Sequence, residues 1–339
     1  MTFPFNIYSL ALVSSAAVAL ATLPFWRRWC ISTGLVDDPG HRKIHDTPIP
    51  LAGGMTVFAA ILIPMVAGII LLSWQGLADG SATLSLNGSK VLGGTSTFLL
   101  KYGYSHRAIQ LAGILLGAAG ILMVGFLDDK YEFRPGVKFA GQFAVALLVC
   151  LSGVRVTLFV PSLIVSYILT VLWILTVINA FNFMDNMNGL CTGLGAIGAL
   201  YFAVAAATSG QYLVTLIATV TFGAMVGFLP YNFPKARAFL GDSGSHLVGY
   251  LLAVLGILPH FYTATNPRPF AVLMPLLILG VPLIDLVWVV ILRWRIGQPF
   301  YRGDNNHLSH RLVRLGLSRT TAVLLIWLAA AALGGICFW

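Results

Sequence analysis

The chain has 339 residues, of which 58% are hydrophobic and only 9% are charged. Soluble globular proteins carry about a quarter charged residues, so this composition excludes that class and indicates a protein that crosses a membrane several times. The formal net charge of +9 has two explanations that stay open: accumulation of Lys and Arg in cytoplasmic loops, or attraction of anionic lipids and phosphorylated substrates. Nucleic acid is not expected as a partner.

The apolar sequence predicts about ten transmembrane helices, because a bilayer core about 30 Å thick needs roughly 20 apolar residues per helix. We expect an all-α polytopic membrane protein with one domain over residues 1–339. Residues 75–107 are expected on the outer side of the membrane. Within them, residues 93–107 could form an interfacial segment, but a solvated connector is favoured. Residues 295–318 are expected to form a cytoplasmic loop. The predicted spans are 7–26, 51–74, 108–127, 137–156, 161–183, 189–210, 212–233, 244–261, 269–294 and 319–339.

The basic residues predict the orientation of these spans. No basic residue precedes the first span, and Arg27 and Arg28 follow it, which is the reverse of a secretory signal peptide. Of the 20 Lys and Arg residues, 15 follow odd-numbered spans, and such residues gather on the cytoplasmic side. We therefore expect a multi-pass protein of the cell inner (cytoplasmic) membrane with its N-terminus outside. The other five basic residues are Lys90, Lys101, Arg107, Arg155 and Arg268.

Five short polar stretches interrupt the apolar sequence, and each follows an odd-numbered span. They must therefore meet on one face of the membrane, the cytoplasmic face by the count above. We interpret them as one composite active site built from five loops. The stretches are 38–45, 128–130, 179–189, 239–245 and 304–311.

The aspartates of these stretches suggest a cation. Asp128 and Asp129 end an apolar run, where ionised groups are costly unless a cation matches them; an ordinary helix-terminal polar pair is equally compatible. Asp242 stands between two glycines just before an apolar helix, and oxygen ligands of this kind suit Mg²⁺. The alternative is that Ser243 or Ser245 caps that helix.

An amide-rich segment lies at the inner end of the fifth span. Asn179, Asn182, Asp185 and Asn188 recur every three residues, so a helix that continued through them would carry them on one stripe. Amides that recognise a sugar or base edge are the favoured interpretation. Amide bridges between helices are the alternative.

Three further features invite an interpretation. The glycine pair at 53–54 starts the second span and offers backbone amides that a phosphate could approach. His307 and His310 lie beside Arg311 without thiolates or carboxylates of a typical zinc site, so phosphate contacts are favoured over metal binding. Asp285 lies inside the ninth span, where an acid is either functional or paired with a neighbouring helix.

The five stretches, in this order, resemble those of the polyprenyl-phosphate N-acetylhexosamine-1-phosphate transferases, over nearly the whole chain. The run Arg42-Lys43-x-His45-x-x-Pro48-x-Pro50-x-x-Gly53-Gly54 and the closing His307-Leu308-x-His310-Arg311-Leu312 are similar to the WecA/TagO branch more than to the MraY branch. The resemblance implies that a sugar 1-phosphate passes from a UDP-sugar, most readily UDP-N-acetylglucosamine, to undecaprenyl phosphate. UMP is released and Mg²⁺ is required, with Mn²⁺ as the alternative.

The resemblance also implies roles for particular residues in this first membrane step of cell-wall or surface polysaccharide synthesis. Asp242 matches the metal ligand, and Asp128, Asp129 and Asp185 match catalytic positions. The expected substrate-binding residues are Lys43, His45, Lys138, Asn179, Asn182, Asn188, Asn232, Phe239, His307, His310 and Arg311.

The sequence departs from the family pattern at three positions. Asn186 and Asn188 stand where Gly and Asp are commoner, and Ser309 stands where many members have His. The identity of the donor sugar is therefore open, with UDP-MurNAc-pentapeptide as an alternative. The sequence also leaves the oligomeric state open, and a homodimer is one possibility. A transporter or flippase is the competing class, but its ionisable groups should lie near the membrane midplane, where Asp285 is the one clear acid.

Overall fold

The computed structural model describes residues 3–38, 47–75, 84–86, 89–92, 94–157, 160–259, 261, 272–299, 301 and 304–338. Its helices are α1 (Phe5–Thr33), α2 (Gly53–Gln75), α3 (Gly94–Tyr131), α4 (Pro135–Leu151), α5 (Leu163–Met184), α6 (Leu190–Thr208), α7 (Tyr212–Asn232), α8 (Gly241–Leu255), α9 (Met274–Ile278), α10 (Gly280–Arg295), α11 (Leu308–Arg314) and α12 (Arg319–Gly335), which a 3₁₀ turn (Ile336–Phe338) follows. Two short antiparallel pairs complete the described structure: β1 (Val36–Asp37) with β2 (Ile49–Pro50), and β3 (Leu84–Leu86) with β4 (Ser89–Leu92).

The prediction of an all-α polytopic membrane protein is confirmed. Seven helices of the described chain are long and apolar enough to cross a membrane: α1, α2, α5, α6, α7, the 102–131 part of α3, and α12 with the turn after it. The other three predicted spans correspond to shorter elements. The helix α4 has 17 residues and α8 has 15, and the predicted ninth span is divided at Leu279 between α9 and α10.

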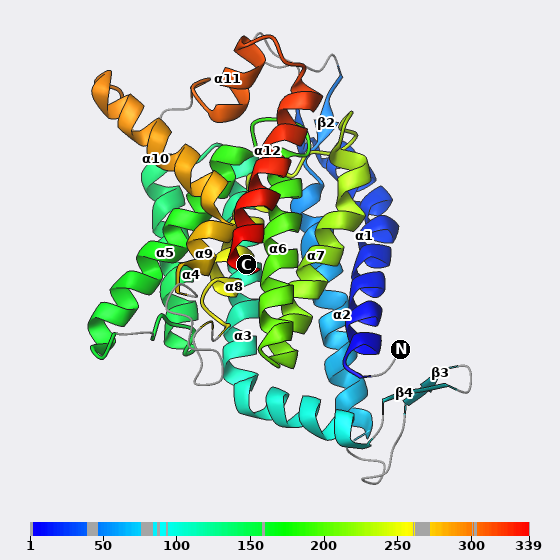
Figure 1. Cartoon of the computed structure of the whole chain (residues 1–339). Coiled ribbons are helices and arrows are strands. Elements are labelled where there is room, and N and C mark those ends of the chain that lie inside the picture. Colours follow the sequence, from blue (N-terminus) through cyan, green and yellow to red (C-terminus); the bar gives the residue numbers. More distant parts are fainter. Residues whose placement is uncertain are drawn as a thin grey trace.

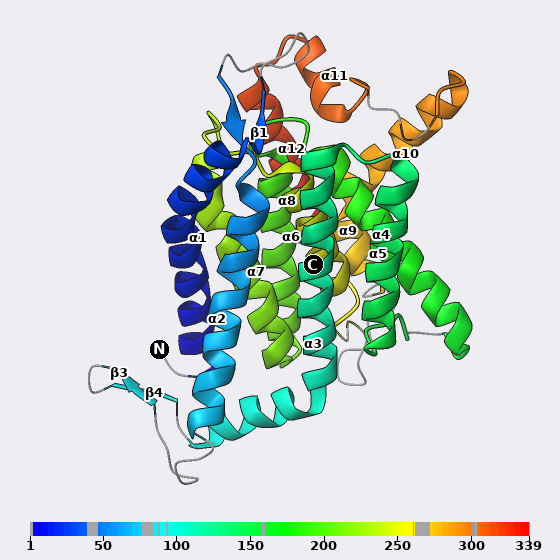
Figure 2. The same cartoon turned by 180° about the vertical axis from the view of Figure 1, so that it is seen from behind.

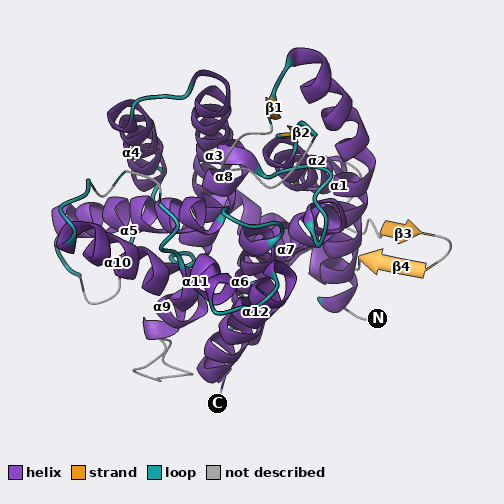
Figure 3. Ribbon diagram, turned by 90° about the horizontal axis from the view of Figure 1, so that it is seen from above, coloured by secondary structure: helices purple, strands orange, loops and turns teal. Residues whose placement is uncertain are grey.

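The short helix α8 forms the centre of the bundle (Figure 3). Every residue from Ser243 to Leu255 is buried, and α8 packs against α2, α3, α5 and α6. Because α8 is enclosed by other helices, its length is set by packing against protein. Glycines permit the close approach: a Cβ on Gly249 would lie 2.7 Å from the Cα of Ile178 in α5, and one on Gly125 would lie 2.5 Å from the carbonyl oxygen of Asp242.

The polar segments gather at one end of the bundle. The C-terminal ends of α1, α3 and α5 lie there with the β1–β2 pair and α11, while the N-terminus of the chain lies at the opposite end (Figures 1 and 2). This arrangement confirms that the described parts of the five stretches meet at one end. The helix α1 continues to Thr33, beyond the predicted span, and ends where Gly34 adopts φ +70°.

The opposite end differs from the expected solvated connector. Residues 94–106 are helical and turn across the end of the bundle, joined to the rest of α3 by a kink at Arg107 (φ −116°, ψ 15°) (Figure 1). Leu100 is buried while Tyr102 is exposed, so the segment has an apolar contact that a solvated loop would lack. The β3–β4 hairpin lies near it.

We predict that the contact between α2 and α8 tolerates no side chain at Gly54. An added Cβ would lie 2.5 Å from Ser243 Oγ and 2.7 Å from the Gly244 nitrogen, and overpacking against backbone typically costs about 1–3 kcal/mol. Gly54→Ala should therefore lower the thermal unfolding midpoint in detergent. Gly68→Ala in the same helix, where a Cβ meets nothing within 4 Å, is the matched control; equal midpoints for the two variants would contradict the packing argument.

Candidate functional site

Two carboxylates and one ammonium form the core of the site. Lys138, in the first turn of α4, places its Nζ 2.7 Å from Asp128 Oδ2 and 2.9 Å from Asp242 Oδ2. The Asp242 side chain keeps 34% of its surface exposed, so a ligand can reach it. The structure thus brings together Asp128 from α3, Lys138 from α4 and Asp242 from α8.

Asp129 has a different task from its neighbour. Its carboxylate accepts hydrogen bonds from the backbone amides of Asp242 (2.7 Å) and Ser243 (3.0 Å), which are unpaired donors at the start of α8. A carboxylate is also favoured at the positive end of a helix dipole. The alternative that Ser243 or Ser245 caps α8 is wrong, because Asp129 in α3 supplies the cap.

The end of α5 completes the core of the site. Asn182 Nδ2 donates to Asp242 Oδ1 at 2.5 Å and to Ser245 Oγ at 3.0 Å. The helix ends at Met184, and Asp185 is its C-cap residue. The predicted stripe of amides is therefore interrupted: Asn188 lies beyond the helix, where its Nδ2 donates to the Pro234 carbonyl at 3.2 Å.

The surroundings of Asp185 favour a positive ligand. Burial raises the pKa of Asp185 to about 8, and the negative charges of Asp242 and Asp129 add to the shift. In the described part of the chain, Lys138 is the basic side chain that pairs with Asp128 and Asp242. A cation bound beside Asp185 would oppose this shift and favour the ionised carboxylate.

A second polar layer lies one helical turn behind the first. Asn179 Nδ2 donates to Gln142 Oε1 at 2.8 Å, and Gln142 Nε2 lies 3.3 Å from His246 Nε2. Gln142 follows Lys138 by four residues, and His246 follows Asp242 by four, so each pair shares a helix face. The contacts of Asn179 match the alternative of an amide bridge between helices. Sequence reasoning missed Gln142 and His246, although this spacing could have identified them.

Asn232 connects the loops around the site. Buried at the end of α7, it accepts hydrogen bonds from the Gly189 amide (3.0 Å) and Thr192 Oγ1 (2.8 Å), and its Nδ2 donates to the Ala238 carbonyl (3.0 Å). These contacts join the segment before α6 to the segment before α8. They give this predicted substrate-binding residue a structural role.

The glycine pair at 53–54 does not offer free amides. The Gly53 amide donates to the Phe239 carbonyl at 2.9 Å, and the Gly54 amide donates to the Leu240 carbonyl at 3.2 Å. The prediction that a phosphate approaches the amides of this pair is therefore wrong. The glycines instead allow α2 to pack closely against the start of α8. Phe239, a predicted substrate-binding residue, contributes its backbone to this contact.

The closing segment brings the two predicted histidines beside α10. His307 is buried, with its ring centre 6.4 Å from that of His310. Burial lowers the pKa of His310, and the neighbouring His307 lowers it further. Arg311 is exposed, with its guanidinium carbon 4.9 Å from the centre of the Trp288 ring in α10.

Two of the departures from the family pattern contact each other. Ser309 Oγ donates to Asn186 Oδ1 at 2.6 Å, and Asn186 Nδ2 donates to the Phe183 carbonyl at 2.6 Å. The pair joins α11 to the end of α5. The predicted site residues Lys43 and His45 lie outside the described residues.

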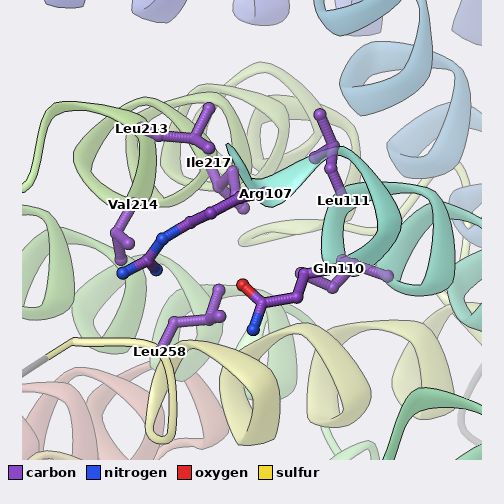
Figure 4. A pocket seen from close by; sticks show the side chains of 8 residues that line it. Arg107, Gln110, Leu111, Leu213, Val214, Ile217 and Leu258 are labelled. Carbon is purple, nitrogen blue, oxygen red and sulfur yellow. The ribbon is translucent and has the colours of Figure 1, made fainter. Parts of the chain in front are cut away.

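A small pocket lies far from these groups, near the kink of α3 (Figure 4). Arg107, which lines it, is about 30 Å along the α3 axis from Asp128. None of the predicted site residues lines this pocket, which is mostly apolar. Its lining residues are Arg107, Gln110, Leu111, Ile114, Leu213, Val214, Ile217 and Leu258.

The fold and the cluster together define a polytopic membrane protein with a carboxylate-rich site at one end of its helix bundle. A family model described as glycosyl transferase family 4 matches residues 111–260. A Bacillus subtilis (strain 168) protein named probable undecaprenyl-phosphate N-acetylglucosaminyl 1-phosphate transferase is 34% identical over 327 residues, covering 94% of this chain and 81% of the relative.

Two further relatives agree with this assignment. The decaprenyl-phosphate N-acetylglucosaminephosphotransferase of Mycobacterium tuberculosis (strain ATCC 25618 / H37Rv) is 32% identical, covering 96% of this chain and 81% of the relative. The undecaprenyl-phosphate alpha-N-acetylglucosaminyl 1-phosphate transferase of Escherichia coli (strain K12) is 28% identical, covering 97% of this chain and 82% of the relative. The chain belongs to the polyprenyl-phosphate N-acetylhexosamine-1-phosphate transferases of glycosyl transferase family 4.

We predict that Asp129→Asn loosens the start of α8. An asparagine keeps one acceptor oxygen but turns an NH₂ toward the second backbone amide, and an unsatisfied buried donor costs about 1–3 kcal/mol. The thermal unfolding midpoint in detergent should fall. The control is Glu132→Gln, an exposed carboxylate three residues further on, which should stay within about 0.5 kcal/mol of the parent protein; similar losses in both variants would contradict the capping role.

Proposed function

We propose that this protein transfers N-acetylglucosamine 1-phosphate from UDP-N-acetylglucosamine to a polyprenyl phosphate and releases UMP. The observation that carries the proposal is the cluster of Asp128, Lys138, Asp242 and Asn182 at one end of a membrane-spanning bundle, where a water-soluble donor and a lipid acceptor can meet. The names of the relatives support the same reaction.

The reaction requires alignment of two anions. An oxygen of the lipid phosphate attacks the sugar-linked phosphorus of the UDP-sugar, a new P–O bond forms, and the bond to the UMP phosphate oxygen breaks. Positioning and charge neutralisation supply most of the catalysis in such transfers. Lys138 offers positive charge at the centre of the site, and Asp128 holds its ammonium at 2.7 Å. We assign Asp128 a positioning role, because a phosphate with a second pKa near 6 needs little help to lose its proton.

The oxygen donors of the site fit Mg²⁺. Mg²⁺ typically takes one or two protein carboxylates and completes its shell with water and substrate phosphates, so it requires no larger ligand cluster, and none is found among the described residues. The carboxylates of Asp128 and Asp242 already bind one shared cation, the Lys138 ammonium. We propose Asp242 as the ligand, with Asp185 nearby. Bound Mg²⁺ would supply a Lewis acid for phosphate oxygens.

We also propose that the site faces the cytoplasm, with the N-terminus outside. The support is the excess of Lys and Arg in the loops at this end of the bundle, since basic residues accumulate on the cytoplasmic side. Nucleotide sugars are water-soluble donors, so a cytoplasmic site also fits the proposed reaction. The corresponding membrane is the cell inner membrane.

The proposal is tested by UMP release from the purified protein in detergent with Mg²⁺, undecaprenyl phosphate and UDP-N-acetylglucosamine. We expect release that requires both lipid and metal. Asp242→Asn should reduce the rate at least about 100-fold, because it removes the proposed metal ligand, while Glu132→Gln should keep it. Lipid-independent release, or full Mg²⁺-dependent activity of Asp242→Asn, would count against the proposal.

Donor preference is the second part of that test. The contact between Asn186 and Ser309 replaces groups that are commoner in the family, so UDP-MurNAc-pentapeptide and other UDP-sugars should be assayed beside UDP-N-acetylglucosamine. We expect the highest rate with UDP-N-acetylglucosamine. A preference for another donor would keep the reaction class and change the sugar.

We predict that Lys138→Met increases the stabilisation by Mg²⁺. Without the ammonium, the carboxylates of Asp128 and Asp242 face each other uncompensated, so the unfolding midpoint in EDTA should fall. A ligand that binds only the folded protein stabilises it more, at one ligand concentration, the more tightly it binds, so Mg²⁺ should raise the midpoint more in the variant than in the parent. An equal rise in both proteins would show that Mg²⁺ does not bind beside Lys138.

A further inference from the structure

A buried carboxylate outside the cluster contacts one of the predicted substrate-binding residues. Asp285, in α10, is 3% exposed. Its Oδ2 lies 2.7 Å from His307 Nδ1, and its Oδ1 accepts a hydrogen bond from the Leu308 amide at 2.7 Å. Leu308 is the first residue of α11, so Asp285 binds both the start of that helix and the histidine before it.

These two contacts determine which nitrogen of His307 carries a proton. When the Asp285 carboxylate is ionised it can only accept, so Nδ1 is then the donor. In the neutral ring the other nitrogen, Nε2, is then unprotonated. No hydrogen bond to Nε2 is found among the described residues, so this nitrogen is left for a ligand.

The histidine is also held against the cluster described above. The Phe183 ring lies 5.5 Å from the His307 ring in an edge-to-face arrangement, and the Arg293 guanidinium carbon lies 4.9 Å from the Phe183 ring centre. Phe183 directly follows Asn182, which donates to Asp242. His307 therefore packs on the same turn of α5 that reaches the carboxylates.

A second ion pair holds the same segment to α10. Arg293 Nε donates to Asp304 Oδ2 at 2.8 Å, and the Asn306 amide donates to Asp304 Oδ1 at 2.8 Å. Burial works to raise the pKa of Asp304, but the hydrogen bonds from Arg293 and Asn306 lower it overall. Asp304 thus anchors the segment without contacting His307.

We propose that Asp285 is a positioning residue of the transfer reaction, which keeps the proton of His307 on Nδ1 and presents the unprotonated Nε2 as a hydrogen-bond acceptor to a substrate hydroxyl. The role in transfer rests on the proposed function. The protonation pattern does not, because it follows from the contacts of Asp285 alone. The carboxylate inside the predicted ninth span thereby acquires a specific partner, His307, in the closing loop.

Asp285→Asn tests the proposal because it should reverse the protonation pattern. The Leu308 amide can only donate, so it holds the oxygen of the new side chain. The NH₂ group must then face His307 Nδ1, which becomes the acceptor, and the proton of the neutral ring moves to Nε2. We expect kcat/KM for UMP release to fall about 3- to 10-fold, the size expected for losing one neutral hydrogen bond.

The protonation pattern can be measured by ¹⁵N NMR of protein labelled at histidine, titrated to a pH at which the ring is neutral. The His307 signals are those lost in His307→Gln. In the parent protein Nε2 should lose its proton as the pH rises, and in Asp285→Asn Nδ1 should lose it. A parent ring protonated at Nε2, or an unchanged pattern in Asp285→Asn, would overturn the proposal.

Asp304→Asn is the matched control, because it makes the same substitution at the other anchor of the segment. It should leave the His307 pattern unchanged; a reversal there would mean that general loosening of the segment, and not Asp285, determines the pattern. The NMR result separates this inference from the proposed function. Absence of UMP release with every donor, beside the expected pattern, would refute the transfer reaction and leave the positioning of His307 intact.

Discussion

The structure depends on how the start of α8 is satisfied. This helix is buried along nearly its whole length, so water cannot solvate its first amides, and an unpaired buried amide is costly. Asp129 in α3 accepts two of them, and Gly125 lets the two helices approach closely enough for that contact. The same contact fixes Asp242 beside Asp128 and Lys138, so the stability of the bundle and the geometry of the site have one origin.

The site is organised in layers behind this contact. The outer layer holds the carboxylates, Lys138 and Asn182, and the layer behind it holds Asn179, Gln142 and His246. Each polar group of the first layer is supported by another within the protein, which limits the reorganisation needed when charged substrates bind. Such preorganised polar surroundings are the main means by which enzymes stabilise transferred phosphoryl groups.

The sequence was sufficient to predict the fold class and the meeting of the polar segments, because both follow from hydropathy and from the order of the spans. It could not distinguish Asp128 from Asp129: adjacent carboxylates look alike until the direction of each side chain is known. It misassigned the glycines at 53–54, since close backbone packing and phosphate binding require the same residue. It also could not pair Asp285 with His307, because that contact depends on how the loop folds back onto α10.

The hydrogen bond between Ser309 and Asn186 joins α11 to the segment that follows α5 through two side chains. The carboxylates of the cluster, in contrast, are fixed by glycines and backbone amides whose geometry few substitutions preserve. The two parts of the site therefore differ in how a substitution acts: a change in the loop pair alters one side-chain contact, whereas a change in the cluster also disturbs the start of α8.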